Sequence, residues 1–387
     1  MESIKNFIQN HKEDWTTKRQ TLHSLAELAG NETKTAYQIT KWLWECKPTE
    51  IIQNIGGHGV VAIFDSKNPG MEIVFRAELD ALPIPETMDI EYASITNGVA
   101  HKCGHDGHMM HLIAVAAYIK ENPLTSGKVT LLFQPSEETG EGAKAILDDP
   151  SFSIDEKAKM YALHNLPGFP KHAIITRKGV FASASTGLIL KLKGKTAHAA
   201  QPETGKSPIN AVKEILDKVD EISQSQSNNK GTVITVIHVI VGEKAFGTSP
   251  ADAEICFTIR APENHQLDEI KSSIVKLGEV ISKNEGLTFS HEEVESFNAT
   301  INNDVLVDEV TRVAQKLSLE IISADVPFRW SEDFGLFTGH FDGVLFGLGA
   351  GIKAPNLHDY SYDYPDELLL TGASILIGIL HENNCFN

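Results

Sequence analysis

The 387-residue sequence predicts an α/β protein: a catalytic α/β/α domain interrupted by an inserted, ferredoxin-like α+β lid or dimerisation domain. In the first part of the chain, near-continuous apolar strands alternate with helices, which is typical of a mostly parallel central sheet covered on both faces. After about Ala184 the order becomes β-α-β-β-α-β, the ferredoxin-like order. We therefore assign residues 1–184 and 295–387 to the catalytic domain and residues 185–294 to the insertion.

The elements of the first domain follow from the spacing of apolar residues. Such residues recur at helical intervals over residues 13–48 and again over 109–120. Three near-continuous apolar runs predict strands: 71–76, 128–133 and 159–163. The chain returns to this domain near Asn303, whose side chain suits a helix cap, and a last helix is predicted over 366–380.

The inserted domain has strands in which apolar residues alternate with others. Its predicted strands are 188–194, 232–241, 253–259 and 287–294. Ser207 and Pro208 open a helix that runs to about Ile222, because Ser is a good cap and Pro suits the first helical turn. A second helix is predicted over 267–283, and the polar run 223–229 predicts an exposed loop.

The composition favours a cytoplasmic protein without nucleic-acid or membrane partners. The formal net charge is −18, and an acidic surface repels phosphate backbones and anionic lipids. The four cysteines are widely spaced, which fits a reducing compartment better than a disulfide framework. The first residues are polar, so we expect no secretory signal, and no apolar run approaches the length of a membrane span.

The run Cys103–His108, Cys-Gly-His-Asp-Gly-His, carries the strongest chemical signal. It places a thiol and an imidazole two residues apart, and its glycines favour a tight loop. It follows the acidic strand end 76–80 and precedes the pair Glu137–Glu138. Sulfur, imidazole and carboxylate are ligands of transition metals. An isolated Cys or His is more often a buried structural residue, so the interpretation depends on further ligands.

The pair Glu137–Glu138 follows the predicted strand 128–133 and lies among turn-forming residues. Acidic pairs are common on solvated surfaces. However, open α/β sheets hold their ligands at the C-terminal ends of strands. Adjacent carboxylates also allow one to bind a metal while the other moves protons. We therefore expect this pair in an active site.

Two more histidines extend the expected ligand set. His164 follows the apolar run 159–163, and His358 comes just after a glycine-rich loop over 347–351. Each alone would more often be a structural or surface histidine, but their shared position after a strand and near a turn favours both as ligands. We expect the other histidines beside the metal run to form hydrogen bonds behind the ligands or to lie on an exposed helix face: His101, His108 and His111.

Several unrelated short motifs occur in a characteristic order. They are Arg76–Pro83, Cys103–His108, Phe133–Glu138, His164-Asn165, Gly194–Pro202 and Ser331–Phe334. Through these motifs the chain resembles, from about Arg19 to about Gly372, the amidohydrolase subgroup of the aminoacylase and glutamate-carboxypeptidase metallopeptidases. That subgroup includes hippurate hydrolases, N-acetyl-diaminopimelate deacetylases and the plant auxin-conjugate hydrolases.

The resemblance implies two divalent metal ions per subunit, with Zn, Mn, Ni and Co as the candidates. Cys103 would bridge the two ions. His105 and His164 would complete one site, and Glu138 with His358 would complete the other. A soft thiolate bridge suits each of these metals in varying degree, so the native metal stays open.

The resemblance also implies the residues of the reaction. Glu137 would be the general base, which takes a proton from water and passes it to the leaving amine. Asp80 would orient a metal ligand. His198, in the inserted domain, would stabilise the tetrahedral oxyanion, often across a dimer interface, and Arg260 would bind the α-carboxylate of the substrate. The inserted domain would pair edge to edge into a homodimer.

The sequence departs from the subgroup at four positions, although every proposed metal ligand is present. Glu78 stands where Asp is usual, Ser136 where Ala is usual, Gly247 where Asn is expected and Trp330 where Gly is usual. Gly247, in place of the expected Asn, removes a polar partner of the substrate carboxylate. Trp330, in place of Gly, would change the shape of the pocket wall.

We therefore predict an amidohydrolase that cleaves small N-acyl amino acids, such as N-acetyl or N-benzoyl compounds, to a carboxylate and a free amino acid. One alternative is a dipeptidase or aminopeptidase-like enzyme of the same family, against which the Cys bridge argues. Another is a non-catalytic binding protein on this scaffold, which would require the loss of metal ligands or of Glu137.

Overall fold

The computed structural model describes residues 2–225 and 231–386, and the chain splits into two compact units. The first unit comprises residues 1–181, 300–325 and 332–387, and the second comprises 182–299 and 326–331. The expected domain limits lie a few residues from these, but the short segment 326–331 was expected in the first domain. The roles of the two units, catalytic domain and lid, stay predictions. No helix within the described ranges is long and apolar enough to cross a membrane.

The first unit is built on an eight-stranded sheet with the order β1-β2-β4-β3-β5-β16-β6-β15. The strands are β1 (Glu50–Ile55), β2 (Gly59–Asp65), β3 (Glu72–Glu78), β4 (Lys128–Gln134), β5 (Lys159–Pro167), β6 (Ile174–Thr176), β15 (Ile321–Ser323) and β16 (Asp342–Gly351). The central strands β4, β3, β5 and β16 run parallel to one another, whereas β1 with β2, β2 with β4 and β6 with β16 are antiparallel. The predicted α/β class with a mainly parallel sheet is therefore confirmed.

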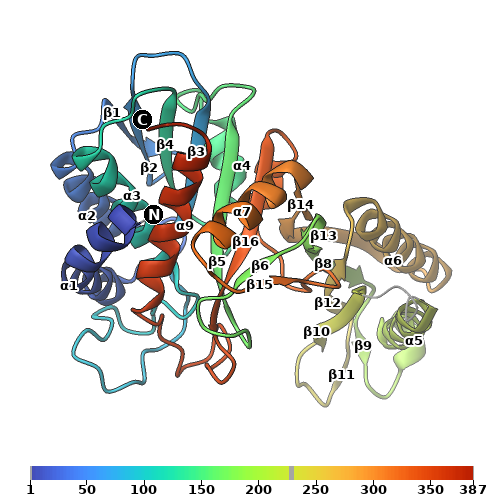
Figure 1. Cartoon of the computed structure of the whole chain (residues 1–387). Coiled ribbons are helices and arrows are strands. Elements are labelled where there is room, and N and C mark those ends of the chain that lie inside the picture. The colour runs from blue at the N-terminus through green and yellow to red at the C-terminus, as the bar shows by residue number, and fades with distance from the viewer. Residues whose placement is uncertain (1, 226–230, 387) are drawn as a thin grey trace. The chain divides into compact units, whose positions relative to one another are not determined.

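Helices cover both faces of this sheet (Figure 1). One face packs against α1 (Glu2–Leu25), α2 (Thr33–Glu45), α3 (His105–Glu121), α7 (Asp304–Lys316) and α9 (Leu368–Glu382). The other face carries α4 (Gly142–Asp148) and α8 (Phe334–Thr338). The central strands are buried on both faces, which explains their near-continuous apolar sequences. The expected cap Asn303 accepts hydrogen bonds from the first backbone N–H groups of α7.

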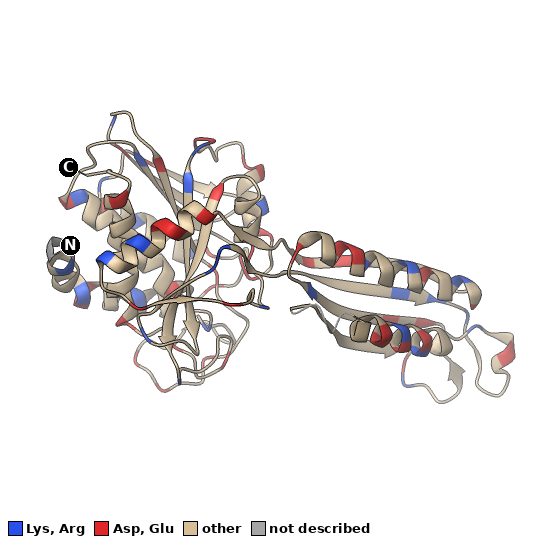
Figure 2. Cartoon of the chain, turned by 45° about the vertical axis from the view of Figure 1, so that its right-hand side comes forward, with Lys and Arg blue, Asp and Glu red and all other residues tan. Residues whose placement is uncertain are grey.

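The second unit is an antiparallel sheet with the order β10-β12-β8-β13 and two helices. Its elements are β8 (Ala184–Lys193), α5 (Ile209–Ser225), β10 (Val233–Val241), β12 (Asp252–Ala261), α6 (Asn264–Asn284) and β13 (Thr288–Phe297). This is the predicted ferredoxin-like topology. Within this unit the short strands β9 (Ala197–His198) and β11 (Thr248–Ser249) pair, and Pro202–Thr204 form the 3₁₀ turn η1. The pair of β7 (Gly179–Ala182) with β14 (Thr300–Asn302) belongs to the first unit, except for Ala182. Acidic and basic side chains are interspersed along α5 and α6 (Figure 2).

Three local expectations need correction or limits. The helical stretch 13–48 is two helices, α1 and α2, with a break in which Leu28 bridges to Ala81. The glycine-rich stretch 347–351 is the end of β16 and not a loop. A Cβ atom at Gly349 would lie 1.9 Å from the carbonyl oxygen of Pro170, so the glycine lets the connection between β5 and β6 pack closely against β16. Of the predicted loop 223–229, the first three residues end α5 and the others lie outside the described residues.

Candidate metal centre

The Cys103–His108 run is a sharp turn that leads directly into α3. Gly104 has a φ of +94° and caps the helix, which begins at His105. A Cβ atom at Gly104 would lie 2.7 Å from the side chain of Asn165, and one at Gly107 would lie 2.5 Å from the ring of Tyr364. Both glycines therefore let the loop pack more closely than any larger residue could. The turn lies near the carboxyl ends of β3, β4 and β5, where the other predicted site residues of this unit gather.

Cys103, His105 and His164 form a buried group whose possible ligand atoms all lie within 4.8 Å of one another. His105 Nδ1 donates to the carbonyl oxygen of Asp80 at 2.9 Å, which leaves its Nε2 lone pair free for a metal. His164 Nδ1 donates to the carbonyl oxygen of Asn165 at 2.9 Å, and its Nε2 lies 3.6 Å from Cys103 Sγ. His164 was expected just after a strand, but β5 continues to Pro167, so this histidine lies within the strand.

A second group shares Cys103 and adds Glu138 and His358. His358 Nε2 lies 3.7 Å from Glu138 Oε1. The backbone of Glu138 is fixed by its N–H, which donates to Asp80 Oδ2 at 2.9 Å. His358 has a φ of +66°, and its N–H donates to the carbonyl oxygen of Lys102 at 2.8 Å, so the residue next to Cys103 holds it. The structure therefore brings together all five predicted metal ligands, with Cys103 common to both groups.

Unpaired polar atoms show that this group of residues fits divalent cations. Among the described residues, His105 Nε2, Glu138 Oε1 and Asp80 Oδ1 are buried without a hydrogen-bond partner. His105 Nε2 lies 3.9 Å from an oxygen of Glu137 and of Glu138, which is too long for a hydrogen bond. Within residues 2–225 and 231–386, no Lys or Arg forms an ion pair with Glu137, Glu138 or Asp80. The site therefore offers buried imidazole nitrogen, carboxylate oxygen and sulfur atoms, and it has more negative than positive side chains. A transition-metal ion binds such a set of donor atoms.

Burial and neighbouring carboxylates raise the pKa values of two acidic groups in the site. Burial, together with the neighbouring Glu332 and Glu138 carboxylates, raises the pKa of Glu137 well above its ordinary value. Burial and the Glu138 carboxylate likewise raise the pKa of the Cys103 thiol. A coordinated cation reverses this effect for a thiol and deprotonates it. Glu137 is buried beside the ligands and belongs to neither of the two Cys103 groups.

A buried salt-bridge network lies behind the candidate ligands, and the sequence analysis assigned no role to its members. Arg76 donates to Glu332 at 2.9 Å and to Asp333 at 2.7 Å, and it also pairs with Glu78. Asp333 in turn accepts from Gln134 Nε2 at 2.7 Å. These residues stand in the motifs Arg76–Pro83 and Ser331–Phe334, so the motifs marked their importance, whereas their pairing depends on the fold.

The three neighbouring histidines are all buried, so of the two expected arrangements the exposed helix face does not occur. His108 Nδ1 donates to Glu78 Oε2 at 2.7 Å, and His111 Nε2 is hydrogen-bonded to the hydroxyl of Tyr364 at 2.9 Å. The expected hydrogen bonds behind the ligands are therefore confirmed for these two. Neither ring nitrogen of His101 has a hydrogen-bond partner among the described residues. Glu78 and His108 could also join His105 as ligands, but their mutual bond and Arg76 already occupy them.

Glu32 is a further residue that the sequence did not reveal. Its buried carboxylate accepts from the N–H of Ser136 at 2.8 Å. Ser136 has a φ of +54°, an unfavourable backbone for a residue with a side chain, and it directly precedes Glu137. Glu32 therefore stabilises the turn that presents the acidic pair. No local sequence signal marks this contact, because it joins segments far apart in the chain.

His198 and Arg260 belong to the second unit. His198 is exposed, and its Nδ1 accepts from the N–H of Ala200 at 3.1 Å, so a neutral ring carries its hydrogen on Nε2. Arg260 Nη1 donates to the carbonyl oxygen of Arg329 at 3.1 Å and to Ser331 Oγ at 3.0 Å. Burial lowers the pKa of Arg260, and no carboxylate within the described ranges forms an ion pair with it.

Two of the four positions that depart from the subgroup, Gly247 and Trp330, lie in the second unit. The carbonyl oxygen of Gly247 accepts from the N–H of Ala199 at 3.0 Å, and a Cβ atom there would meet nothing within 4 Å. The ring of Trp330 stacks on Phe328, with ring centroids 5.2 Å apart. Neither position therefore disturbs the backbone of this unit.

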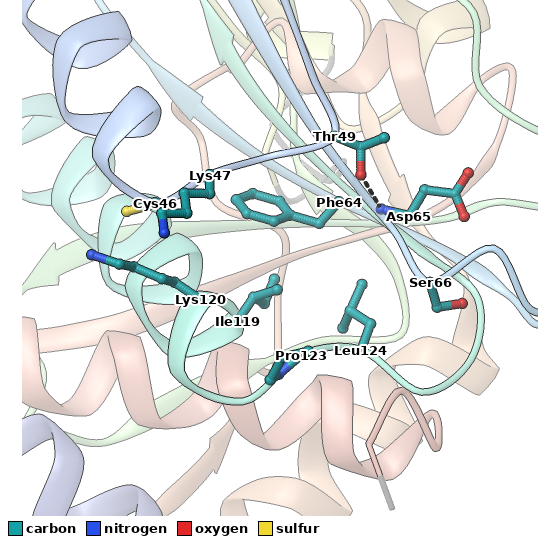
Figure 3. A pocket seen from close by; sticks show the side chains of 10 residues that line it. All are labelled: Cys46, Lys47, Thr49, Phe64, Asp65, Ser66, Ile119, Lys120, Pro123 and Leu124. Carbon is teal, nitrogen blue, oxygen red and sulfur yellow. Dashed lines mark hydrogen bonds between the residues drawn. The ribbon is translucent and has the colours of Figure 1, made fainter.

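A separate pocket of about 350 Å³ lies in the first unit (Figure 3). Its lining includes Cys46, Phe64, Ile119 and Lys120. None of the predicted site residues lines it. Burial raises the pKa of the Cys46 thiol to about 11, as it also raises the pKa of Cys103, but Cys46 belongs to neither of the two candidate ligand groups.

A family model for peptidase family M20/M25/M40 matches residues 74–382. The chain belongs to this family. It is 29% identical to a hippurate hydrolase from Campylobacter jejuni, over 92% of this chain and 93% of that protein. It is 30% identical to an N-acetyl-L-cysteine deacetylase from Bacillus subtilis, over 86% of this chain and 79% of that protein. This member of the M20/M25/M40 family is therefore a metal-dependent hydrolase of amide bonds.

Solved structures show the same fold. A protein from methicillin-resistant Staphylococcus aureus superimposes with a TM-score of 0.87 at 23% identity, over 99% of each chain. The Bacillus subtilis YXEP protein, described as a dinuclear metal binding peptidase from the M20 family, gives a TM-score of 0.79 at 23% identity. That alignment covers 96% of this chain and 97% of the other. Because both structures are only 23% identical to this chain, they support its fold and nothing further.

Proposed function

We propose that this protein is a dinuclear metal-dependent amidohydrolase that cleaves N-acyl amino acids to a carboxylate and a free amino acid. One observation carries the proposal: Cys103 lies in two ligand groups at once, one with His105 and His164 and one with Glu138 and His358. Ions held by these two groups would satisfy His105 Nε2 and Glu138 Oε1, which are buried without a hydrogen-bond partner. The hippurate hydrolase and the deacetylase among the relatives act on small N-acyl amino acids by name.

The residues of the site would divide the work of hydrolysis. The bound ions, either Zn, Mn, Ni or Co, would supply Lewis-acid polarisation of the amide carbonyl and of water. Glu137, which lies beside the ligands without being needed as one, would accept a proton from the attacking water. It would then donate that proton to the leaving amine nitrogen as the C–N bond breaks. Asp80 would hold the histidine and the carboxylate of the centre in place, through its contacts with His105 and Glu138.

His198 and Arg260 are the substrate-binding residues in this proposal. The hydrogen on His198 Nε2 would be donated to the oxyanion of the tetrahedral intermediate. Arg260 is a partly buried cation without a carboxylate partner among the described residues, and the α-carboxylate of an N-acyl amino acid would supply one.

We also propose that the protein is a homodimer that pairs through β10. This strand lies at the edge of its sheet, and it contains no Lys, Arg, Asp or Glu. Its apolar side chains Val236, Ile237 and Ile240 are 45%, 59% and 49% exposed. Edge strands that stay unpaired are usually protected by charges, so this one is suited to pair with a second copy. A cytoplasmic location fits the free thiols of all four cysteines.

The test is a hydrolysis screen with metal-free protein and with protein reconstituted with each candidate metal. N-acetyl, N-benzoyl and indole-acyl amino acids are compared with dipeptides. We expect hydrolysis only after a metal is added, and faster turnover of N-acyl amino acids than of dipeptides. Full activity in protein shown by elemental analysis to be metal-free would overturn the proposal, and a preference for dipeptides would replace it with a dipeptidase.

A further inference from the structure

Arg19 is a fully buried cation at the end of α1 that contacts three carboxylates. Its Nη1 lies 2.7 Å from Asp363 Oδ1 and 3.2 Å from Asp106 Oδ2, and its Nε lies 2.8 Å from Asp366 Oδ1. The family model begins at residue 74, so it does not include Arg19. A buried guanidinium with several charged hydrogen bonds fixes the geometry of its partners.

The three carboxylates belong to the two segments that carry the ligands of different ions. Asp106 is next to His105 in the turn that leads into α3. Asp363 and Asp366 follow His358 in the irregular segment before α9. Arg19 therefore joins the Cys103–His105 turn to the His358 segment.

A second buried cation makes the same connection. Lys102 Nζ donates to the carbonyl oxygen of Tyr362 at 3.0 Å and to Glu86 Oε1 at 2.8 Å. The carbonyl oxygen of Lys102 accepts the N–H of His358 at 2.8 Å. His23 bridges Glu86 and Asp106. The His358 segment is thus fixed to the metal turn through one cluster of buried charges.

His358 depends on this cluster more than the other histidine ligands do. The His358 side chain is 50% exposed, and its neighbours Asp359 and Tyr360 are exposed as well. His105 and His164 are instead buried within α3 and β5. Loosening the cluster should therefore move His358 and leave the other two histidines in place.

We infer that Arg19 is a positioning residue that holds His358 in reach of Glu138 and so sets the affinity for the second metal ion. This inference rests on the proposed two-ion centre. Without the guanidinium, Asp106, Asp363 and Asp366 would repel one another, and the His358 segment would separate from the turn. The ion held by Cys103, His105 and His164 would remain bound.

The test is a metal titration of metal-free protein with Zn²⁺ or Mn²⁺, read by calorimetry and by metal content after desalting, so that it does not depend on turnover. The variants are Arg19→Met and Asp366→Asn. The second is the milder change, because the Asp366 side chain is 26% exposed in the wild type. The control is Glu309→Gln, which alters another buried pair, Lys159–Glu309, with no ligand segment attached to the glutamate. We expect the wild type and the control to bind two ions. In both variants the second ion should bind about 10–100-fold more weakly and the first should bind as in the wild type.

The outcomes separate the two proposals. A wild-type protein that binds fewer than two ions would overturn the proposed dinuclear function. A wild type with two ions and variants that match Glu309→Gln in both affinities would overturn the role of Arg19, as would an equal loss of both ions in Asp366→Asn. If Arg19→Met does not fold, Asp366→Asn decides alone.

Discussion

His23 should make the stability of this protein depend on pH in a way that its replacement abolishes. Its ring is fully buried, with Nδ1 2.9 Å from Asp106 Oδ2 and Nε2 2.9 Å from Glu86 Oε2. Burial by itself lowers the pKa of His23, but the hydrogen bonds to Asp106 and Glu86 outweigh burial and raise the pKa from 6.5 to about 9. The folded protein therefore keeps His23 charged at pH values where the unfolded chain has released the proton.

The size and sign of the effect follow from this difference in pKa. Because one pKa unit corresponds to about 1.4 kcal/mol, the rise to about 9 is worth about 3 kcal/mol of folding free energy. A raised pKa gives stability that is fully present below the unfolded value of 6.5 and is lost as the pH rises through about 9. The wild type should thus lose about 3 kcal/mol relative to a His23→Gln variant across this window.

The assay is urea unfolding of both proteins between about pH 6 and about pH 9, at one metal concentration. His265→Gln is the control, because His265 is exposed and also lies 3.2 Å from a carboxylate, that of Glu263. We expect the gap in unfolding free energy between wild type and His23→Gln to shrink as the pH rises, and by more than the gap between wild type and His265→Gln changes. A constant gap for His23→Gln would show that the buried ring is not held as a cation, and the reasoning would be refuted.

Three further predictions concern the metal, the substrate and the assembly. Cys103→Ser should weaken metal binding in a titration because a hydroxyl is a poor anionic bridge at neutral pH, whereas the equally buried Cys46→Ser in the pocket of Figure 3 should bind metal normally; equal losses would exclude the bridge. Arg260→Ala should raise KM about tenfold or more for free-acid N-acyl amino acids and little for carboxyl-amidated ones, since a hydrogen bond to a charged group is worth about 1.5–3 kcal/mol; an equal penalty would make Arg260 structural. Ile237→Lys combined with Ile240→Lys should convert the proposed dimer to a monomer in sedimentation, and a variant that stays dimeric would place the interface away from β10.

Much of the fold could be predicted because the strongly patterned elements are also the buried ones. The apolar runs became β3, β4 and β5, and the alternating segments became β8, β10, β12 and β13. The hairpin of β1 and β2 was not predicted, and it adds antiparallel pairing at one side of the sheet. The glycines at the end of β16 look like a loop in the sequence. In the structure they are small because Leu166 approaches Gly347 closely and Pro170 approaches Gly349 closely.

The candidate ligands could be predicted because metal sites use sulfur, imidazole and carboxylate side chains, which stand here in short motifs that are visible in the sequence. The residues that hold these side chains in place could not be predicted from the sequence. Arg19 contacts Asp363 and Asp366, and Glu32 contacts Ser136, across separations in sequence that no local pattern records. A charged residue in an amphipathic helix normally faces solvent, so Arg19 looks unremarkable until the fold buries it. Tertiary pairing of charges is therefore the part of this site that only the structure reveals.

The most direct test of the proposed mechanism is to measure metal content and kcat together for Glu137→Gln. Glu137 lies beside the ligands but is not needed to complete either group that contains Cys103. We predict that the variant keeps two ions and the wild-type fold while kcat for an N-acyl amino acid falls by about 10²–10⁴-fold. A variant that holds two ions and turns over at a near wild-type rate would contradict the account.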